Sequence, residues 1–166
     1  FLRSVLKDEQ GIGLLQGPKS CGKTTMVRQL SEKMPGDAAV AVIDGSRIRP
    51  RELLSEILSQ FGYDTGLGEV DELLGMIKVF AVQQTCSCEP PIIVIDNVDR
   101  MYPSALKALD TLAGMKTKQR FVIRLILTGH EGLNSLVKSD GMSSIAKRSA
   151  EIFSMEPLTP IETKLY

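Results

Sequence analysis

The sequence predicts a doubly wound α/β domain, in which helices cover both faces of a parallel sheet. Continuous apolar runs, as in 38–43 and 92–95, are typical of strands that are buried on both faces of such a sheet. Between these runs lie helical stripes of apolar residues, as in 51–61 and 69–85. Strands that alternate with helices in this way indicate a parallel sheet with crossover helices.

A glycine-rich motif follows the first predicted strand, the apolar run 12–15. Residues 17–24 fit the pattern G-x-x-x-x-G-K-[ST] at every fixed position and lead into a helix predicted over 24–33. Strand, loop and helix in this order are the setting of a phosphate-binding loop. Gly17 and Gly22 allow backbone angles at which successive N–H groups turn toward an anion. We therefore expect this chain to bind a nucleoside triphosphate.

The residues of this loop have expected roles in holding the nucleotide. The Lys23 ammonium group is expected to reach the β- and γ-phosphates, and the Thr24 hydroxyl is expected to ligate Mg²⁺. The start of the following helix adds unpaired N–H groups and the positive end of its dipole. The residues expected to contact the nucleotide are Gly17, Pro18, Lys19, Ser20, Cys21, Gly22, Lys23, Thr24 and Thr25.

The rest of the chain continues the alternation of helices and strands. The other predicted elements are a short amphipathic helix over 1–7, a helix over 103–113, a strand over 121–127, short helices over 131–138 and 143–148, and a last strand over 151–155. Thr159, Pro160 and Glu162 then form a capping box with proline at the first helical position, which predicts the start of a further helix.

Composition and charge restrict the class of protein. Twenty basic and twenty acidic side chains give zero net charge, so a strongly basic nucleic-acid footprint is absent, although a local patch stays open. No apolar run approaches the roughly 20 residues that are needed to cross a bilayer. Cys21, Cys86 and Cys88 form neither a disulfide framework nor a zinc motif, which favours free thiols in a reducing compartment. We therefore expect a cytoplasmic segment that does not insert into a membrane.

Asp96 and Asn97, which directly follow the strand 92–95, are candidates for catalysis. Ligands bind at the carboxyl ends of strands in open α/β sheets, and the Asp96 carboxylate there can hold Mg²⁺ opposite Thr24. Asn97 stands where many loop ATPases carry a glutamate that deprotonates the attacking water. An amide can hold a water but cannot take its proton, and a positioned base contributes about 10²–10⁴-fold. We therefore expect binding with slow or absent hydrolysis.

Other polar residues lie near the ends of predicted elements. Thr128 and His130 follow the strand 121–127, and either could sense the γ-phosphate or its water if that strand lies between the two strands that carry the phosphate loop and Asp96. His130 can equally be a hydrogen-bonded loop residue. Asp99 could replace the missing glutamate, but we interpret Asp99-Arg100 as a solvated turn pair.

The order of these motifs resembles that of the AAA+ superfamily of P-loop NTPases. After the phosphate loop and the strand with its Asp come Leu-Ile-Leu-Thr-Gly-His-Glu-Gly-Leu, Ala-Lys-Arg, and Pro-Leu-Thr-Pro-Ile-Glu-Thr. Within the superfamily the chain is similar to the ExeA/GspA-type ATPases of bacterial secretion and envelope assembly, and to the transposition helper TniB. ExeA-type sequences have roughly Leu-Val-Gly-Gln-Pro-Glu-Leu as the middle motif. The resemblance covers nearly the whole chain from Ile12 onward.

The resemblance implies a three-layer sandwich with a parallel sheet of order 5-1-4-3-2. It makes Thr128 or His130 the sensor, and Arg148, otherwise a surface charge, a candidate arginine finger that acts on a neighbouring subunit. Such a finger implies nucleotide-dependent homo-oligomers. It also divides the chain into a nucleotide-binding core over 1–158 and the start of a truncated helical lid over 159–166.

Three functions are compatible with these features. The first is a cytoplasmic Mg-ATP-binding core of an ExeA-like ATPase, which can be part of an inner-membrane protein and acts as a switch or assembly factor for an unknown partner of the envelope or secretion machinery. Its intrinsic turnover of ATP to ADP and phosphate would be weak. The second is a DNA-associated ATP switch. The third is a small-molecule kinase, in which Arg47, Arg49 and Arg51 would imitate a mobile lid.

Overall fold

The computed structural model describes residues 11–32, 38–66, 68–87, 89–118, 120–148 and 151–156. The helix predicted over 1–7 and the helix start predicted at 159–162 lie outside these residues, so both stay predictions. Among the described residues, no helix combines the length and the apolar character that a membrane span requires.

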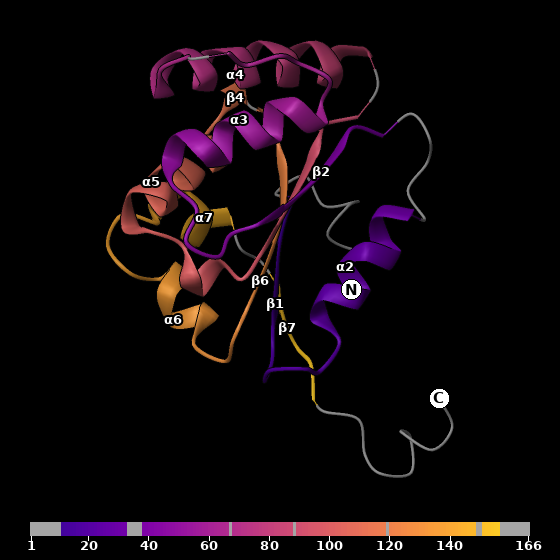
Figure 1. The fold of residues 1–166 in the computed structure, drawn as a ribbon, viewed down its shortest axis with the longest axis vertical. Coiled ribbons are helices and arrows are strands. Elements are labelled where there is room, and N and C mark those ends of the chain that lie inside the picture. Colours follow the sequence, from indigo (N-terminus) through magenta and orange to yellow (C-terminus); the bar gives the residue numbers. More distant parts are fainter. Residues whose placement is uncertain are drawn as a thin grey trace.

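A five-stranded parallel sheet forms the centre of the domain (Figure 1). Its order is β2-β3-β6-β1-β7. The strands are β1 Ile12–Gln16, β2 Val40–Asp44, β3 Ile92–Asp96, β6 Arg124–Gly129 and β7 Glu151–Ser154. When these five strands alone are numbered along the chain, the order is 5-1-4-3-2 read from the β7 edge. This is the order that the AAA+ resemblance predicts, so that prediction is confirmed.

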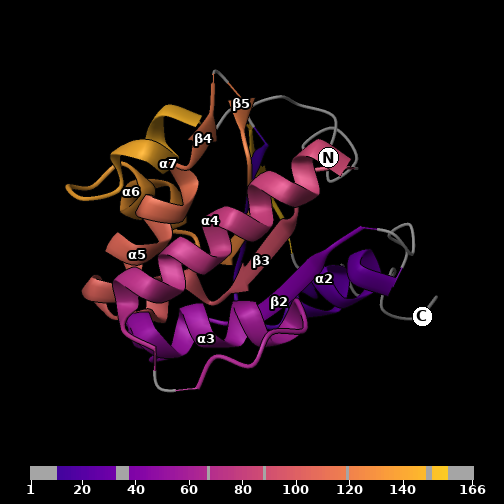
Figure 2. The same ribbon diagram turned by 90° about the horizontal axis from the view of Figure 1, so that it is seen from above.

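Helices cover both faces of this sheet, as the alternation of the sequence predicts (Figures 1 and 2). Among the described helices, α2 lies on one face, where its Val27 packs with apolar residues of β3 and β6. The others lie on the opposite face and form the larger core with the sheet. Their bounds are α2 Lys23–Glu32, α3 Pro50–Gln60, α4 Val70–Ser87, α5 Pro103–Ala113, α6 Leu133–Val137 and α7 Ser143–Arg148, with a 3₁₀ turn η1 at Val98–Arg100.

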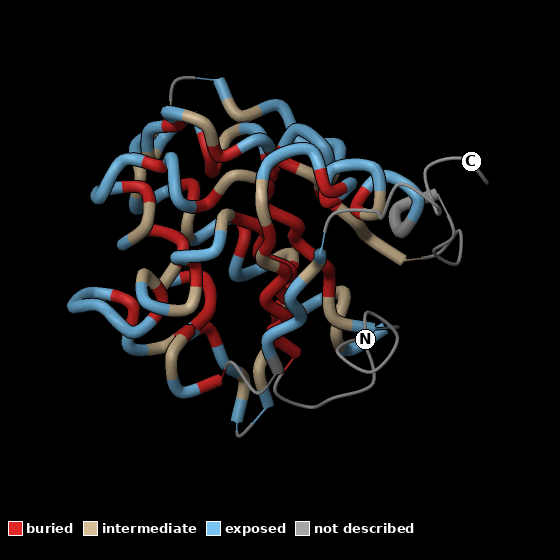
Figure 3. Tube along the Cα trace, turned by 90° about the horizontal axis from the view of Figure 1, so that it is seen from below, coloured by how far each residue is buried: buried red, intermediate tan, exposed pale blue. Residues whose placement is uncertain are grey.

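Buried residues concentrate along the central strands (Figure 3). Every residue of β3 is buried, because helices cover both of its faces. The central strands therefore form a fixed support, and their carboxyl ends position the loops that follow them.

One predicted strand is placed differently. The strand predicted over 121–127 is wrong at its start, because β6 begins at Arg124 and extends to Gly129. Phe121 belongs instead to a short antiparallel hairpin of β4 Lys116–Thr117 and β5 Arg120–Phe121. Its ring lies beneath the Lys116 ammonium, 4.2 Å from the ring centroid. The apolar pattern alone does not indicate this change of pairing partner.

Strand β2 lies at one edge of the sheet, and a side chain satisfies part of its free backbone. Gln60 at the end of α3 accepts the Val42 N–H at 2.7 Å and donates to the Val42 carbonyl at 2.8 Å. The amide thus takes the place of a neighbouring strand at this position, which protects the edge against unwanted pairing.

Candidate nucleotide-binding site

The loop between β1 and α2 has the curled backbone that the motif predicts. Gly22 has φ of +91°, an angle that glycine adopts at little cost. Ser20 also has a positive φ, of 61°, which the motif does not indicate. Gly17 has no positive φ, so the expected reason for this glycine is wrong. A Cβ at Gly17 would lie 2.6 Å from the Met155 carbonyl oxygen and 2.9 Å from the Cys21 Sγ, so glycine is needed here for space.

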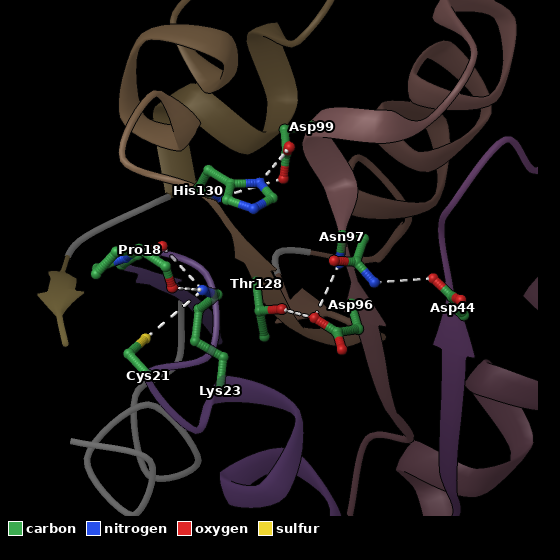
Figure 4. A network of polar contacts seen from close by, with 10 residues as sticks. Pro18, Cys21, Lys23, Asp44, Asp96, Asn97, Asp99, Thr128 and His130 are labelled. Atoms are coloured by element: carbon green, nitrogen blue, oxygen red, sulfur yellow. Dashed lines mark hydrogen bonds and ion pairs between the residues drawn. The ribbon is translucent and has the colours of Figure 1, made fainter. Parts of the chain in front are cut away.

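The Lys23 ammonium group lies at the centre of this loop (Figure 4). Its Nζ donates to the carbonyl oxygens of Gly17 at 2.8 Å and Pro18 at 2.6 Å, and lies 3.6 Å from the Cys21 Sγ. Lys23 is only 8% exposed. A phosphate is a stronger partner for an ammonium group than a carbonyl, because both partners are then ionised. The group that holds the loop together can therefore turn to a bound phosphate.

The Asp96 carboxylate at the end of β3 receives hydroxyl groups from two neighbouring elements. Thr24 Oγ1 at the start of α2 donates to Asp96 Oδ2 at 2.5 Å. The Thr128 hydroxyl on β6 donates to the other oxygen, Oδ1, which also accepts the Asn97 N–H at 2.9 Å. Thr128 is fully buried and Asp96 is 6% exposed. The structure thus brings together Thr24, Asp96 and Thr128, although their spacing in the sequence is large.

The oxygen atoms of Thr24 and Asp96 suit magnesium. Mg²⁺ prefers hard oxygen ligands and is usually bound through one or two carboxylates together with substrate phosphates and waters. In the part of the chain that the structure describes, no group of three or more His, Cys, Asp or Glu side chains could hold a metal. One hydroxyl and one carboxylate are hard oxygen donors, so this donor set fits a Mg²⁺ that nucleotide phosphates and waters also hold.

Asn97 lines the same region, but its amide is held by β2. The residue has a left-handed backbone, with φ of 54° and ψ of 41°. Its Nδ2 donates to Asp44 Oδ1 at 3.0 Å, and in Figure 4 the side chain points away from the phosphate loop. Burial raises the pKa of Asp44, but hydrogen bonds from Asn97 and Ser46 outweigh it and lower the pKa overall. Asp44 is therefore an ionised acceptor that fixes the Asn97 amide.

The His130 imidazole is held by Asp99. Asp99 Oδ2 lies 2.7 Å from His130 Nδ1, and Oδ1 accepts the His130 backbone N–H at 3.1 Å. Gly129 makes room for this, since a Cβ there would lie 2.8 Å from Asp99 Oδ1. Burial raises the pKa of Asp99, but the two hydrogen bonds and the charge of His130 outweigh it and lower the pKa. Asp99 and Arg100 lie exposed on the turn η1, as predicted, but Asp99 in addition pairs with His130, which the sequence does not indicate.

The phosphate loop, the start of α2 and the residues that follow β3 and β6 line an open cleft of about 420 Å³. That volume lies within the range of small-molecule sites, about 300–1,000 Å³. The residues that line it are Lys19, Ser20, Gly22, Lys23, Thr24, Thr25, Asn97, Arg100 and His130. Sequence reasoning missed Arg100 as a cleft residue. The available signal was its place on the turn directly after Asp96 and Asn97, at the carboxyl end of a strand.

The structure does not bring Arg148 to this cleft. Its guanidinium donates to the carbonyls of Ala113 and Ile123, the latter at 2.8 Å, and lies 3.8 Å from the centroid of the Phe121 ring. Ile123 precedes β6, so Arg148 lies near the amino ends of the strands, whereas the phosphate loop lies at their carboxyl ends. Arg148 is 2% exposed, so its interpretation as a surface charge is wrong. The arginine finger stays a prediction, and this placement counts against it.

Replacing Arg148 by methionine should lower the free energy of unfolding by about 1–3 kcal/mol, because two buried carbonyls lose their donor. Urea denaturation measures this change. Lys147→Met is the matched control, since Lys147 is the exposed neighbour on the same helix and should change stability little. Equal stability of the Arg148→Met variant and the wild type would contradict a structural role for the guanidinium.

A phosphate loop after β1, an aspartate at the end of β3 and the strand order between them define a P-loop NTPase fold. The chain matches the AAA domain family over residues 6–137 and therefore belongs to that family. This bears out the resemblance to AAA+ proteins that the order of motifs indicates.

Comparison with individual proteins agrees with this family. The chain is 24% identical over 163 residues to general secretion pathway protein A of Aeromonas hydrophila, across 97% of the chain and 30% of that protein. It is similar in fold to Cdc6p from Pyrobaculum aerophilum, with a TM-score of 0.69, 19% identity, and coverage of 91% of this chain and 40% of the other. The Aeropyrum pernix ORC2 protein, solved as ADPNP–ADP complexes, gives a TM-score of 0.69 at 14% identity, with coverage of 94% and 45%. The chain thus spans less than half the length of each of these relatives.

Proposed function

We propose that this domain is a Mg-ATP-dependent switch with slow hydrolysis of its own. The observation that carries the proposal is the position of Asp96, whose two carboxylate oxygens accept the hydroxyls of Thr24 and Thr128 beside the Lys23 loop. The arrangement places one residue from the phosphate loop's helix and one from β6 on a single carboxylate. Binding of the triphosphate at the loop can therefore alter contacts at the ends of β3 and β6.

Different residues of the cleft would hold the phosphates and the Mg²⁺ ion. Lys23 would exchange its contacts with the Gly17 and Pro18 carbonyls for contacts with phosphate oxygens. The N–H groups of the curled loop and of the start of α2 would hold the remaining phosphate charge. Thr24 and Asp96 would hold Mg²⁺, which when bound supplies positive charge beside the β- and γ-phosphates.

Slow turnover is proposed because residue 97 is an amide. Asn97 cannot accept a proton from water, and its Nδ2 is occupied by Asp44. A domain that binds ATP and hydrolyses it slowly stays in the bound state long enough to act as a switch for a partner.

The similarity to general secretion pathway protein A supports a role in secretion or envelope assembly, with the domain in the cytoplasm or on the cytoplasmic part of an inner-membrane protein. Membership of the AAA domain family supports nucleotide-dependent homo-oligomers with an unidentified protein partner. We propose the division into a core over 1–158 and a helical lid that begins at 159–166 on the same grounds.

ATP binding should depend on Mg²⁺ through Thr24. Isothermal titration should give an affinity for ATP that falls at least about tenfold when Mg²⁺ is removed, a difference of about 1.4 kcal/mol. Thr24→Val should bind ATP in Mg²⁺ as weakly as the wild type does without the ion. Thr111→Val is the matched control, because the Thr111 hydroxyl donates to its own helix at 3.0 Å, on exposed α5 surface. Equal wild-type affinity with and without Mg²⁺ would count against the proposed function.

Sedimentation velocity on the same samples tests the switch. The chain should form larger assemblies with Mg-ATP than with Mg-ADP. If the chain sediments identically with the two nucleotides, the domain binds ATP but does not act as the proposed switch.

A further inference from the structure

The cleft holds a histidine whose ring orientation is fixed by a carboxylate. Asp99 contacts both the backbone N–H and the ring Nδ1 of His130, at 3.1 and 2.7 Å. The absence of a side chain at Gly129 gives the carboxylate its place. The side chains of His130 and Asp99 are 29% and 24% exposed, so the pair is partly shielded but open to the cleft.

This contact determines which ring nitrogen of a neutral His130 can accept a proton. An ionised carboxylate only accepts hydrogen bonds, so Nδ1 must be the protonated nitrogen in the pair. The other nitrogen, Nε2, then carries a lone pair. Figure 4 shows the imidazole between Asp99 and the phosphate loop, with Nε2 on the side away from Asp99. His130 also lines the cleft together with Lys23 and Thr24.

We propose that His130 is the catalytic base of ATP hydrolysis in this domain and that Asp99 is its positioning residue. The inference rests on the proposed function. In the step, the water oxygen forms a bond to the γ-phosphorus, and the bond between that phosphorus and the β–γ bridging oxygen breaks. The water proton moves to His130 Nε2 and is later released to solvent, which leaves ADP and inorganic phosphate.

The amide at residue 97 supports the assignment of His130 as the base. The residue that supplies the base in many loop ATPases is here an amide, and Asp44 holds that amide at 3.0 Å. Among the described side chains that line the cleft, His130 is the one that carries an imidazole, whose nitrogen can accept a proton from water when the ring is neutral. The residue that accepts the water proton therefore lies after β6, at His130, and not after β3, at residue 97.

The rate should then depend on pH through one imidazole. The charged groups that contact His130, line its cleft or follow it in the sequence are Lys19, Lys23, Asp99, Arg100 and Glu131, and Asp96 accepts the hydroxyl of Thr128, two residues before His130. Carboxylates, lysines and arginines ordinarily keep their charge between pH 5 and 8, whereas an imidazole changes its charge in that range. Protonation at low pH removes the base, so hydrolysis should slow as the pH falls.

Nitrogen NMR of the imidazole tests the orientation without any nucleotide. The chain has one histidine, so its ring signals need no further assignment. At a pH where the ring is neutral, the long-range ¹H–¹⁵N spectrum should show the proton on Nδ1. Asp99→Asn should reduce this preference, and Asp64→Asn should leave it unchanged, because Asp64 is an exposed aspartate in a distant turn that also accepts a backbone N–H. A wild-type ring that carries its proton on Nε2 would overturn the proposal.

Single-turnover hydrolysis of Mg-ATP, measured from pH 5.5 to 8.5 with protein in excess, tests the chemistry. The wild-type rate should rise with pH and reach a plateau. His130→Gln, which keeps a hydrogen-bonding side chain, should lower the plateau by about 10²-fold, the low end for a positioned base, and abolish the pH dependence. Asp99→Asn should lower the rate less and keep the pH dependence, and Asp64→Asn should match the wild type.

Titration of Mg-ATP into the same samples separates the two proposals. We expect the His130→Gln and Asp99→Asn variants to bind ATP within about threefold of the wild-type affinity. Their slower hydrolysis then results from the chemical step and not from weaker binding. If the wild type binds no ATP, the proposed function fails. If it binds ATP and His130→Gln hydrolyses it with the wild-type rate and pH profile, or the wild type does not hydrolyse it at all, the inference about His130 alone fails.

Discussion

Replacing Lys23 by alanine should abolish measurable Mg-ATP binding. The ammonium group lies at the centre of the loop, within 2.8 Å of the Gly17 carbonyl and 2.6 Å of the Pro18 carbonyl, where a phosphate would meet it. A hydrogen bond to a charged group contributes about 1.5–3 kcal/mol. Loss of two such contacts with phosphate oxygens corresponds to about 10²–10⁴-fold in affinity. Isothermal titration calorimetry measures this loss.

Lys78→Ala is the matched control for this substitution. Lys78 is an exposed lysine on α4, and it is not among the residues that line the cleft. Its removal should leave the affinity unchanged. Circular dichroism of both variants should show a folded protein, because the three hydrogen bonds that the Lys23 ammonium makes within the described residues all go to the phosphate loop itself. An Lys23→Ala variant with undiminished affinity would overturn the assignment of the site.

Replacing Asn97 by glutamate should raise the rate of ATP hydrolysis by up to about 10²-fold, because a carboxylate at this position can accept the proton of the attacking water and His130 already supplies the low end of the 10²–10⁴-fold range of a positioned base. The neighbouring Asp44 opposes this effect. A glutamate at this position would place a second negative charge beside Asp44 Oδ1, which now lies 3.0 Å from the Asn97 Nδ2. Asn97→Glu combined with Asp44→Asn should therefore be faster than Asn97→Glu alone.

Asn97→Gln is the control for side-chain length, because it has the reach of glutamate and no basic group. It should hydrolyse ATP no faster than the wild type. Steady-state phosphate release measures all four proteins. If neither glutamate variant exceeds the wild-type rate, the amide at residue 97 is not the reason for slow turnover.

The sequence predicted the elements whose signals are local. The phosphate loop follows from spacing, and the buried strands follow from their apolar runs, since a parallel sheet leaves both faces of a strand dry. The strand order came from the resemblance to AAA+ proteins and not from the apolar pattern. The convergence of Thr24 and Asp96 was foreseeable because the carboxyl ends of parallel strands share one edge of the sheet.

What the sequence did not predict depends on contacts between distant segments. The Asp99–His130 pair joins residues 31 positions apart through a space that Gly129 leaves open. Arg148 is an ordinary charged residue in a helical pattern, and only the folded chain shows two carbonyls and the Phe121 ring around it. The sequence pattern does not separate the hairpin that contains Phe121 from β6, because the mostly apolar run 121–127 does not mark where the pairing changes.

The close contact at Gly17 has a mechanical consequence. The Met155 carbonyl occupies the place where a side chain would stand, and the Met155 N–H donates to the Gln16 carbonyl at 2.8 Å. The first residue after β7 is thus hydrogen-bonded to the residue before the phosphate loop, and it leaves no room for a side chain at Gly17. A change in the shape of the loop that moved Gln16 or Gly17 would therefore meet the Met155 backbone, which links the phosphate loop to the chain that leaves β7.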